Sequence, residues 1–171
     1  MKNIKKILFI AFLFTFFPMT VYASGVDVGK IEVAIERKIN EVRVNNKLEK
    51  LEFVDDNDEV AKAAAVRAKE CAEIGDVSHI RPNGKLGPTI LNKKYNRAEN
   101  LAVVYEVRGC TEEEIAQFVI EGWINSKEHM DVLTDSTNMN CHFNVAAVAV
   151  YKAKKKGEDV YYVCLLVRDD K

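Results

Sequence analysis

The side chains best suited to bind a metal or move a proton near neutral pH are few in this sequence. Neutral imidazole and carboxylate groups do this chemistry, and the chain has three histidines, His79, His129 and His142. It has no H-E-x-x-H helix, G-x-S-x-G elbow, Walker loop or dinucleotide-binding glycine pattern. A metal-binding or proton-transfer site must therefore be inferred from the positions of individual histidines and carboxylates in the sequence.

The first candidate pair is His79 and Glu99. His79 lies in the segment SHIRPNGK (78–85), whose proline and glycine indicate a turn. Glu99 stands in the apolar segment AENLAVV, where a buried carboxylate is costly unless it has a partner. An imidazolium or a bound cation would serve, so we expect His79 to face Glu99, with Asn100 beside it. The alternative is that His79 is an ordinary hydrogen-bonded loop residue.

The second candidate pair is Ser126 and His129, which share one face if their segment is helical. Each has a simpler alternative, because Ser126 is a typical helix cap and His129 can take part in the same cap. His142 precedes an apolar run, and its residue context assigns it no chemistry. The candidate cleft residues are therefore His79, Glu99, Asn100, Ser126 and His129.

Hydrophobic periodicity predicts two helices in the first half of the chain. One begins near Ile31 and stops at a pair of asparagines; the other is capped by Asn57 or Asp58, carries a face of alanines and ends at Gly75. The irregular stretch that follows, about 76–97, is long for a small domain. Such stretches are more often functional than idle.

Two further helices are expected in the second half. The segment AENLAVVYEV (98–107) is too short to assign from its period. Thr111 and Glu114 then have the spacing of a capping box, and the helix they start has a predicted buried stripe that includes Phe118. Ser126 opens another short helix.

Two β-branched and aromatic runs, 143–153 and 159–168, are joined by the turn sequence KKKGE. They predict an antiparallel hairpin, and their nearly continuous apolarity requires cover on both faces. The fold class is therefore α/β, an α-β-α sandwich with a central antiparallel sheet covered by helices on both sides.

The first 23 residues are typical of a secretory signal peptide. Lysines precede an apolar run that begins at Ile7, and small residues lead to an expected cut after Ala23. The run has about 11 residues, fewer than the ~20 that span a membrane, so a membrane anchor is the weaker alternative. We expect a secreted, extracellular protein without stable membrane insertion, divided into a signal peptide at 1–23, a linker at 24–27 and one domain at 28–171.

Charge argues against a nucleic-acid partner. Three of the 25 basic residues leave with the signal peptide, so 22 remain against 26 acidic ones, a net charge of −4. No basic stretch interleaved with aromatic residues offsets that balance.

The four cysteines all follow the signal peptide, and an even count in an exported chain permits up to two disulfides. Their spacing leaves all three connectivities open, and buried free thiols are the alternative. The absence of a C-x-x-C pair argues against a thiol redox site. The cysteines are Cys71, Cys110, Cys141 and Cys164.

Several short motifs occur in one order along the chain, and together they resemble the CAP superfamily of cysteine-rich secretory proteins, antigen 5 and pathogenesis-related proteins. The chain is most similar to the bacterial branch of small secreted SCP-domain proteins. The resemblance runs from about Val28 to the C-terminus. The motifs are I-N-E-x-R from Ile39, A-A-x-R-A from Ala64, S-H-x-R-P-N-G from Ser78, A-E-N-L-A from Ala98, W-x-x-S-x-x-H from Trp123 and Y-Y-V from Tyr161.

The resemblance implies an α-β-α sandwich with a surface cleft that, in eukaryotic members, is lined by two His and two Glu able to hold a divalent ion. His79 and Glu99 match one residue of each type. Ser126 stands where the second Glu is expected, and His142 is nearest in order to the second His. Bacterial members carry a histidine after the Trp helix, which His129 matches.

The resemblance thus implies His79, Glu99 and His129 as candidate ligands for zinc or another divalent cation, the one cofactor considered. It also favours a disulfide between Cys71 and Cys141. The leading functional hypothesis is a non-enzymatic secreted protein that binds a small apolar ligand, a divalent metal or an extracellular protein partner in this cleft. The alternatives are a metal-dependent hydrolase of peptide or cell-wall material, and a structural surface interaction module.

Overall fold

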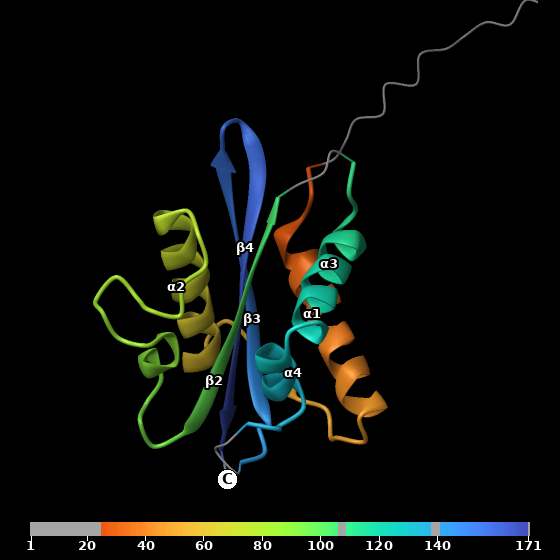
Figure 1. Ribbon diagram of the computed structural model, residues 1–171, viewed down its shortest axis with the longest axis vertical. Coiled ribbons are helices and arrows are strands. Elements are labelled where there is room, and N and C mark those ends of the chain that lie inside the picture. The colour runs from red at the N-terminus through yellow and green to blue at the C-terminus, as the bar shows by residue number, and fades with distance from the viewer. Residues whose placement is uncertain (1–24, 106–108, 138–140, 171) are drawn as a thin grey trace, which may run out of the picture.

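The computed structural model describes residues 25–105, 109–137 and 141–170; the expected signal peptide lies outside them. A four-stranded sheet separates two helical layers (Figure 1). In chain order the elements are α1 (Val28–Asn45), β1 (Glu52–Phe53), α2 (Glu59–Ile74), the short 3₁₀ helix η1 (Gly87–Ile90), β2 (Asn96–Tyr105), α3 (Glu112–Ile124), α4 (Lys127–Leu133), β3 (Val145–Lys155) and β4 (Glu158–Asp169).

The strand order is β1-β3-β4-β2. The predicted hairpin is β3 with β4, and β2 pairs antiparallel with the other side of β4 over its whole length. The apolar segment of undecided type is therefore a strand, and it forms one edge of the sheet. The sheet is not wholly antiparallel, because β1 pairs in parallel with β3 over two residues.

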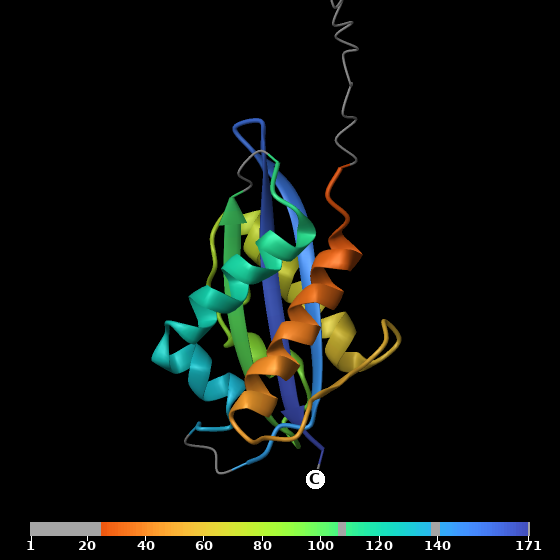
Figure 2. The same ribbon diagram turned by 90° about the vertical axis from the view of Figure 1, so that its right-hand side faces the viewer.

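Helices cover both faces of the sheet, as the apolarity of the hairpin predicted. One core lies between the sheet and α1, α3 and α4, and the other between the sheet and α2. Figure 2 shows α1 and α3 lying across the first face. On the second face the alanines of α2 allow close packing, since Ala63, Ala64 and Ala68 are buried there. No helix of the described part of the chain is long and apolar enough to cross a membrane.

Helix ends follow the expected local chemistry. Asp58 caps α2 by accepting from the Val60 N–H, and Gly75 ends that helix with a φ of +74°. Thr111 and Glu114 form the full capping box of α3. Ser126 caps α4 through the N–H of His129.

The cysteines do not pair as expected. Cys71 packs in the core on the α2 side of the sheet, whereas Cys141 packs in the core on the opposite side. Because the sheet stands between them, a Cys71–Cys141 disulfide is wrong for this fold. All four cysteines are free thiols.

Candidate functional site

The main partner of Glu99 is an arginine, rather than a histidine or a bound cation. It lies on β2 and points toward α2, where Arg67 Nε donates to its Oε2 at 2.7 Å and Arg67 Nη2 to its Oε1 at 3.3 Å. Both side chains are only 1% exposed. Burial lowers the pKa of Arg67, but hydrogen bonds to Glu99 and Glu70 outweigh it and raise the pKa overall. The buried carboxylate thus has a guanidinium as its main partner.

His79 adds a second contact to the same carboxylate. Its Nδ1 lies 3.0 Å from Glu99 Oε1, while half of its ring is exposed. The loop that carries it is pinned to α2, because Arg67 Nη2 donates to the carbonyl of Ser78 and Arg81 is bonded to Glu70. The irregular stretch after α2 is therefore held in place by a network of buried and half-buried charges.

Gly87 closes over the Glu99 carboxylate. Its N–H donates to the carbonyl of His79 at 2.7 Å, and a Cβ on Gly87 would lie 2.3 Å from Glu99 Oε1. This separation is far inside van der Waals contact, so only glycine fits here. The turn after His79 thus packs backbone directly on the carboxylate.

The carboxylate of Glu99 does not fit the role of a metal ligand. Its Oε1 contacts Arg67 Nη2 and His79 Nδ1, and its Oε2 contacts Arg67 Nε and, at 3.8 Å, the thiol of Cys164. A carboxylate has about four acceptor sites, and these contacts use them. Within the described ranges no three His, Cys, Asp or Glu side chains converge as a metal site. The Glu99 carboxylate therefore has no free acceptor site to offer a divalent ion.

His129 reaches the same edge of the sheet from the other layer. Its ring centroid lies 6.4 Å from that of His79. Asn100, next to Glu99 on β2, points to the opposite face, where its Nδ2 donates to the carbonyl of His129 at 3.0 Å. Asn100 is fully buried, so it positions α4 and does not line a cleft. The two histidines thus approach each other around the edge strand β2.

The surroundings of the His129 ring disfavour its protonated form. Burial and the nearby charge of His79 lower its pKa, although Glu128 acts weakly the other way. Its Nδ1 is buried and has no hydrogen-bond partner among the residues that the structure describes. Ser126 is occupied as the cap of α4, where it also donates to Glu128. Buried polar atoms are normally hydrogen-bonded, so this unpaired nitrogen is a local cost to the fold.

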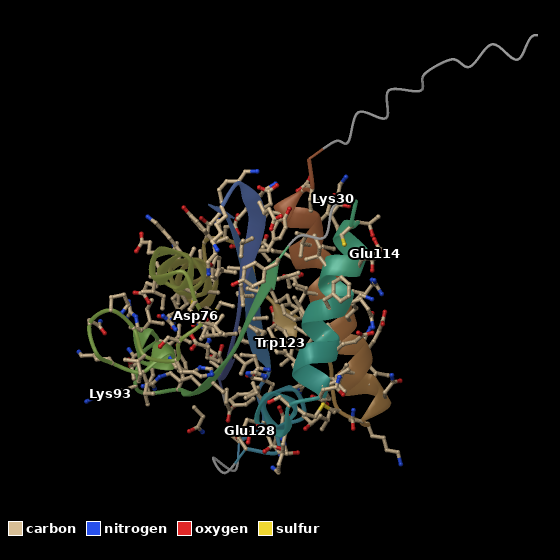
Figure 3. The ribbon with its side chains drawn as sticks, turned by 45° about the horizontal axis from the view of Figure 1, so that its top comes forward. Lys30, Asp76, Lys93, Glu114, Trp123 and Glu128 are labelled. Carbon is tan, nitrogen blue, oxygen red and sulfur yellow. The ribbon has the colours of Figure 1, made fainter. Side chains whose placement is uncertain are left out.

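A groove of about 460 Å³ extends from His129 along β2 and α3. Its lining is almost wholly apolar, and Trp123 closes its inner side between α3 and the sheet (Figure 3). Phe118 was expected in the buried stripe of α3 but is 50% exposed at this groove. The lining residues are Leu101, Ala102, Val103, Val104, Tyr105, Phe118, Val119, Gly122, Trp123 and His129.

His142 lies apart from the other two histidines. It lines a separate pocket with Arg43 and Asp135, and its ring is 84% exposed, 3.6 Å from Asp135 Oδ2. It does not join the histidine pair at β2.

Sequence reasoning missed two residues that set this geometry. Arg67 belongs to the A-A-x-R-A motif. Its place on the small-residue face of a helix is the signal that it has a buried carboxylate partner. Gly87 carried no signal beyond its turn-rich surroundings.

Comparison with known proteins settles the family. The sequence profile described as "CAP: Cysteine-rich secretory protein family" matches residues 36–166, most of the chain. The chain belongs to the CAP family. No curated protein sequence matches the chain significantly.

Two solved structures show the same fold as this CAP domain. An outer surface protein of Borrelia burgdorferi superposes with a TM-score of 0.58 at 19% identity, covering 85% of this chain and 97% of that one. An extracellular protein of Bacillus anthracis that contains an SCP domain gives a TM-score of 0.60 at 18% identity, covering 83% of this chain but 41% of the other. At such identities the likeness concerns the fold alone.

Proposed function

We propose that this CAP domain is a secreted, non-enzymatic binding protein, and that its ligand lies in the groove between β2 and α3. The observation that carries the proposal is the groove itself, an open and mostly apolar hollow lined by the half-exposed Phe118 and Tyr105, with His129 at one end. A hollow with a few polar groups in an apolar lining is the usual form of a ligand site.

Burial of apolar surface supplies the driving force. Phe118 and Tyr105 are each 50% exposed, and both line the groove. Each Å² of apolar surface that a ligand covers stabilises the complex by about 25 cal/mol.

The arrangement of hydroxyl groups supports binding rather than turnover. A histidine that activates a nucleophile must be hydrogen-bonded to it. Here the Ser78 hydroxyl donates to the carbonyl of Ile80, and the Ser126 hydroxyl to Glu128. His79 is in turn engaged with Glu99.

Secretion is supported by two observations. The amino-terminal segment has the order of charges and apolar residues of a secretory signal. The two structural relatives are described as an outer surface protein and an extracellular protein.

The test is a titration with the neutral apolar dye Nile red, whose fluorescence rises on leaving water. Gly122 lines the groove, and an added Cβ there meets no heavy atom within 4 Å. Gly122→Leu therefore adds an apolar side chain at the groove from a position whose Cβ has open space around it, and it also replaces a glycine inside a helix, which favours folding. We expect dye affinity to fall at least about tenfold.

Val66→Ala is the matched control, because Val66 is an exposed apolar residue on α2, in the other layer. This variant should bind the dye like the wild type. Equal dye binding by Gly122→Leu and the wild type would overturn the proposal.

A further inference from the structure

We propose that the occupant of this groove is an extended basic peptide segment that adds to β2 as a fifth strand. This inference rests on the proposed function and names the class of its ligand. Five consecutive residues of β2, from Leu101 to Tyr105, line the groove. Side chains of a strand alternate between its two faces, so a hollow on one face alone would touch every second residue. The groove therefore includes the open backbone edge of β2.

This edge is covered in one half and open in the other. At its start, Arg97 donates to the carbonyl of Pro88, and Gly87 packs on Glu99. The second half, LAVVY, has no charge and no proline. Natural edge strands are normally blunted by such residues or covered, because an open apolar edge pairs with other chains. This half of β2 lacks that protection among the described residues.

At this edge the carbonyl of Leu101 is already occupied, whereas the backbone of Val103 is open. The carbonyl of Leu101 accepts from the indole N–H of Trp123 at 3.0 Å, which indicates that it points away from β4. In an antiparallel ladder alternate residues direct both backbone groups to the same side, so Val103 also faces the open edge. Among the described residues, Val103 makes no backbone–backbone hydrogen bond beyond those within the sheet.

The wall of the groove suits alternate side chains of such a strand. Phe118 and Gly122 lie one turn apart on α3, and both face the groove. Phe118 offers an aromatic contact, and Gly122 leaves room for an apolar side chain. A peptide paired with Val103 would direct every second side chain to this wall.

Charge on the same side favours a basic peptide. Glu114 lies four residues before Phe118 on α3 and Glu121 three residues after it, so both flank the groove wall on one side of the helix. Opposite charges steer association and select partners. Glu112 and Glu113 lie instead at the pocket between α1 and α3, and Asp131 is paired with Lys127.

The experiment uses three capped, fluorescein-labelled peptides of alternating lysine and valine, seven residues long. One peptide is unmodified. The second is N-methylated on its odd-numbered amides and the third on its even-numbered amides. A docked strand directs only one set of amides to β2. We therefore expect N-methylation of one set to weaken binding at least about tenfold and the other to change it little. A peptide with glutamate in place of lysine should bind more weakly.

Two variants place the peptide at this edge. Val103→Pro removes the N–H offered to the peptide, at a position where an edge strand tolerates proline, and Gly122→Leu adds an apolar side chain at the groove. Both should lower affinity for the unmodified peptide at least about tenfold, with circular dichroism unchanged. Val66→Ala should bind it like the wild type.

The outcomes separate the two proposals. Suppose that Nile red binds in the groove. If both N-methylated peptides then bind like the unmodified one, or if no peptide binds, the strand inference falls and the proposed function stands. If neither dye nor peptide binds, both fall. Self-association of the wild type that Val103→Pro abolishes would make a second copy the occupant and overturn the peptide inference.

Discussion

Arg67 and Glu99 form a two-point ion pair across the interface of α2 and β2, with side chains that are both 1% exposed. The same guanidinium bonds to Glu70 and to the carbonyl of Ser78. One buried cation thus ties together a helix, an edge strand and the loop that carries His79. The Glu-Asn pair of the family motif serves here to hold elements in place, with Glu99 fixing one layer and Asn100 the other.

Glu99→Gln should destabilise the fold strongly, because it leaves the buried guanidinium of Arg67 without its counter-charge. We expect a loss of about 3 kcal/mol or more in the free energy of unfolding, or roughly 6–12 °C in Tm for a domain of this size. Thermal unfolding followed by circular dichroism measures it. Glu113→Gln is the control, since Glu113 pairs with Arg37 on the exposed surface and should cost less than about 1 kcal/mol. Equal losses for the two variants would contradict the structural role of the pair.

Gly87→Ala should cost about 1–3 kcal/mol, because the new methyl group meets the fixed carboxylate of Glu99. Gly122→Ala is a matched glycine replacement on α3 that meets nothing within 4 Å. It should be neutral or stabilising by up to about 1 kcal/mol. Urea unfolding of both variants checks the difference. A Gly87→Ala variant as stable as the wild type would mean that the loop does not pack on Glu99.

His129 should titrate below its ordinary pKa of 6.5, because burial and the charge of His79 both lower it. His79→Asn removes that repulsion, so the pKa of His129 should rise, as measured by NMR of its ring protons. His142→Asn, a change in a separate pocket, should leave the titration where it is. A fall in the pKa of His129 on His79→Asn would be inconsistent with the ring arrangement.

The same shift makes stability depend on pH. Between the lowered pKa in the folded state and about 6.5 in the unfolded state, the unfolded chain binds the proton more readily. Stability should therefore fall as pH drops below about 6.5, and this contribution should be flat above it. His129→Gln should flatten the slope in that window, as measured by urea unfolding from pH 5 to 8.

All four thiols should react with iodoacetamide in denaturant without reductant, since all four cysteines are free. In the native protein Cys110 should be labelled first, because it is only partly buried and the other three are buried. Mass spectrometry of the alkylated protein reads both results. Two fewer alkylated sites without reductant than with it would reveal a disulfide that this fold does not contain.

Local chemistry was enough to predict much of the fold. The Thr111–Glu114 capping box, the Asp58 cap and the Gly75 stop act within a few residues, so they can be recognised in sequence. The double-sided apolarity of the hairpin likewise indicated two layers of helices. The CAP fold expected from the motif order is confirmed by the match over residues 36–166.

What sequence could not supply depends on contacts between distant segments. Glu99 clearly needed a partner, but that the partner is Arg67 follows only from packing α2 on β2. Partly buried free cysteines were one of the open alternatives, but the separation of Cys71 from Cys141 by the sheet could not be inferred from their spacing. Phe118 has helical spacing suited to a core position, yet the sheet ends at β2 and leaves half of its ring uncovered.

We propose that ligands bind in the groove between β2 and α3. The most direct test is an amide-resolved NMR map of the ¹⁵N-labelled protein during titration with indole, a small, soluble apolar probe. The largest shift changes should fall on Leu101–Tyr105, on Phe118–Trp123 and on the indole N–H of Trp123. Changes gathered instead between α1 and α3, or around His142, would contradict the claim.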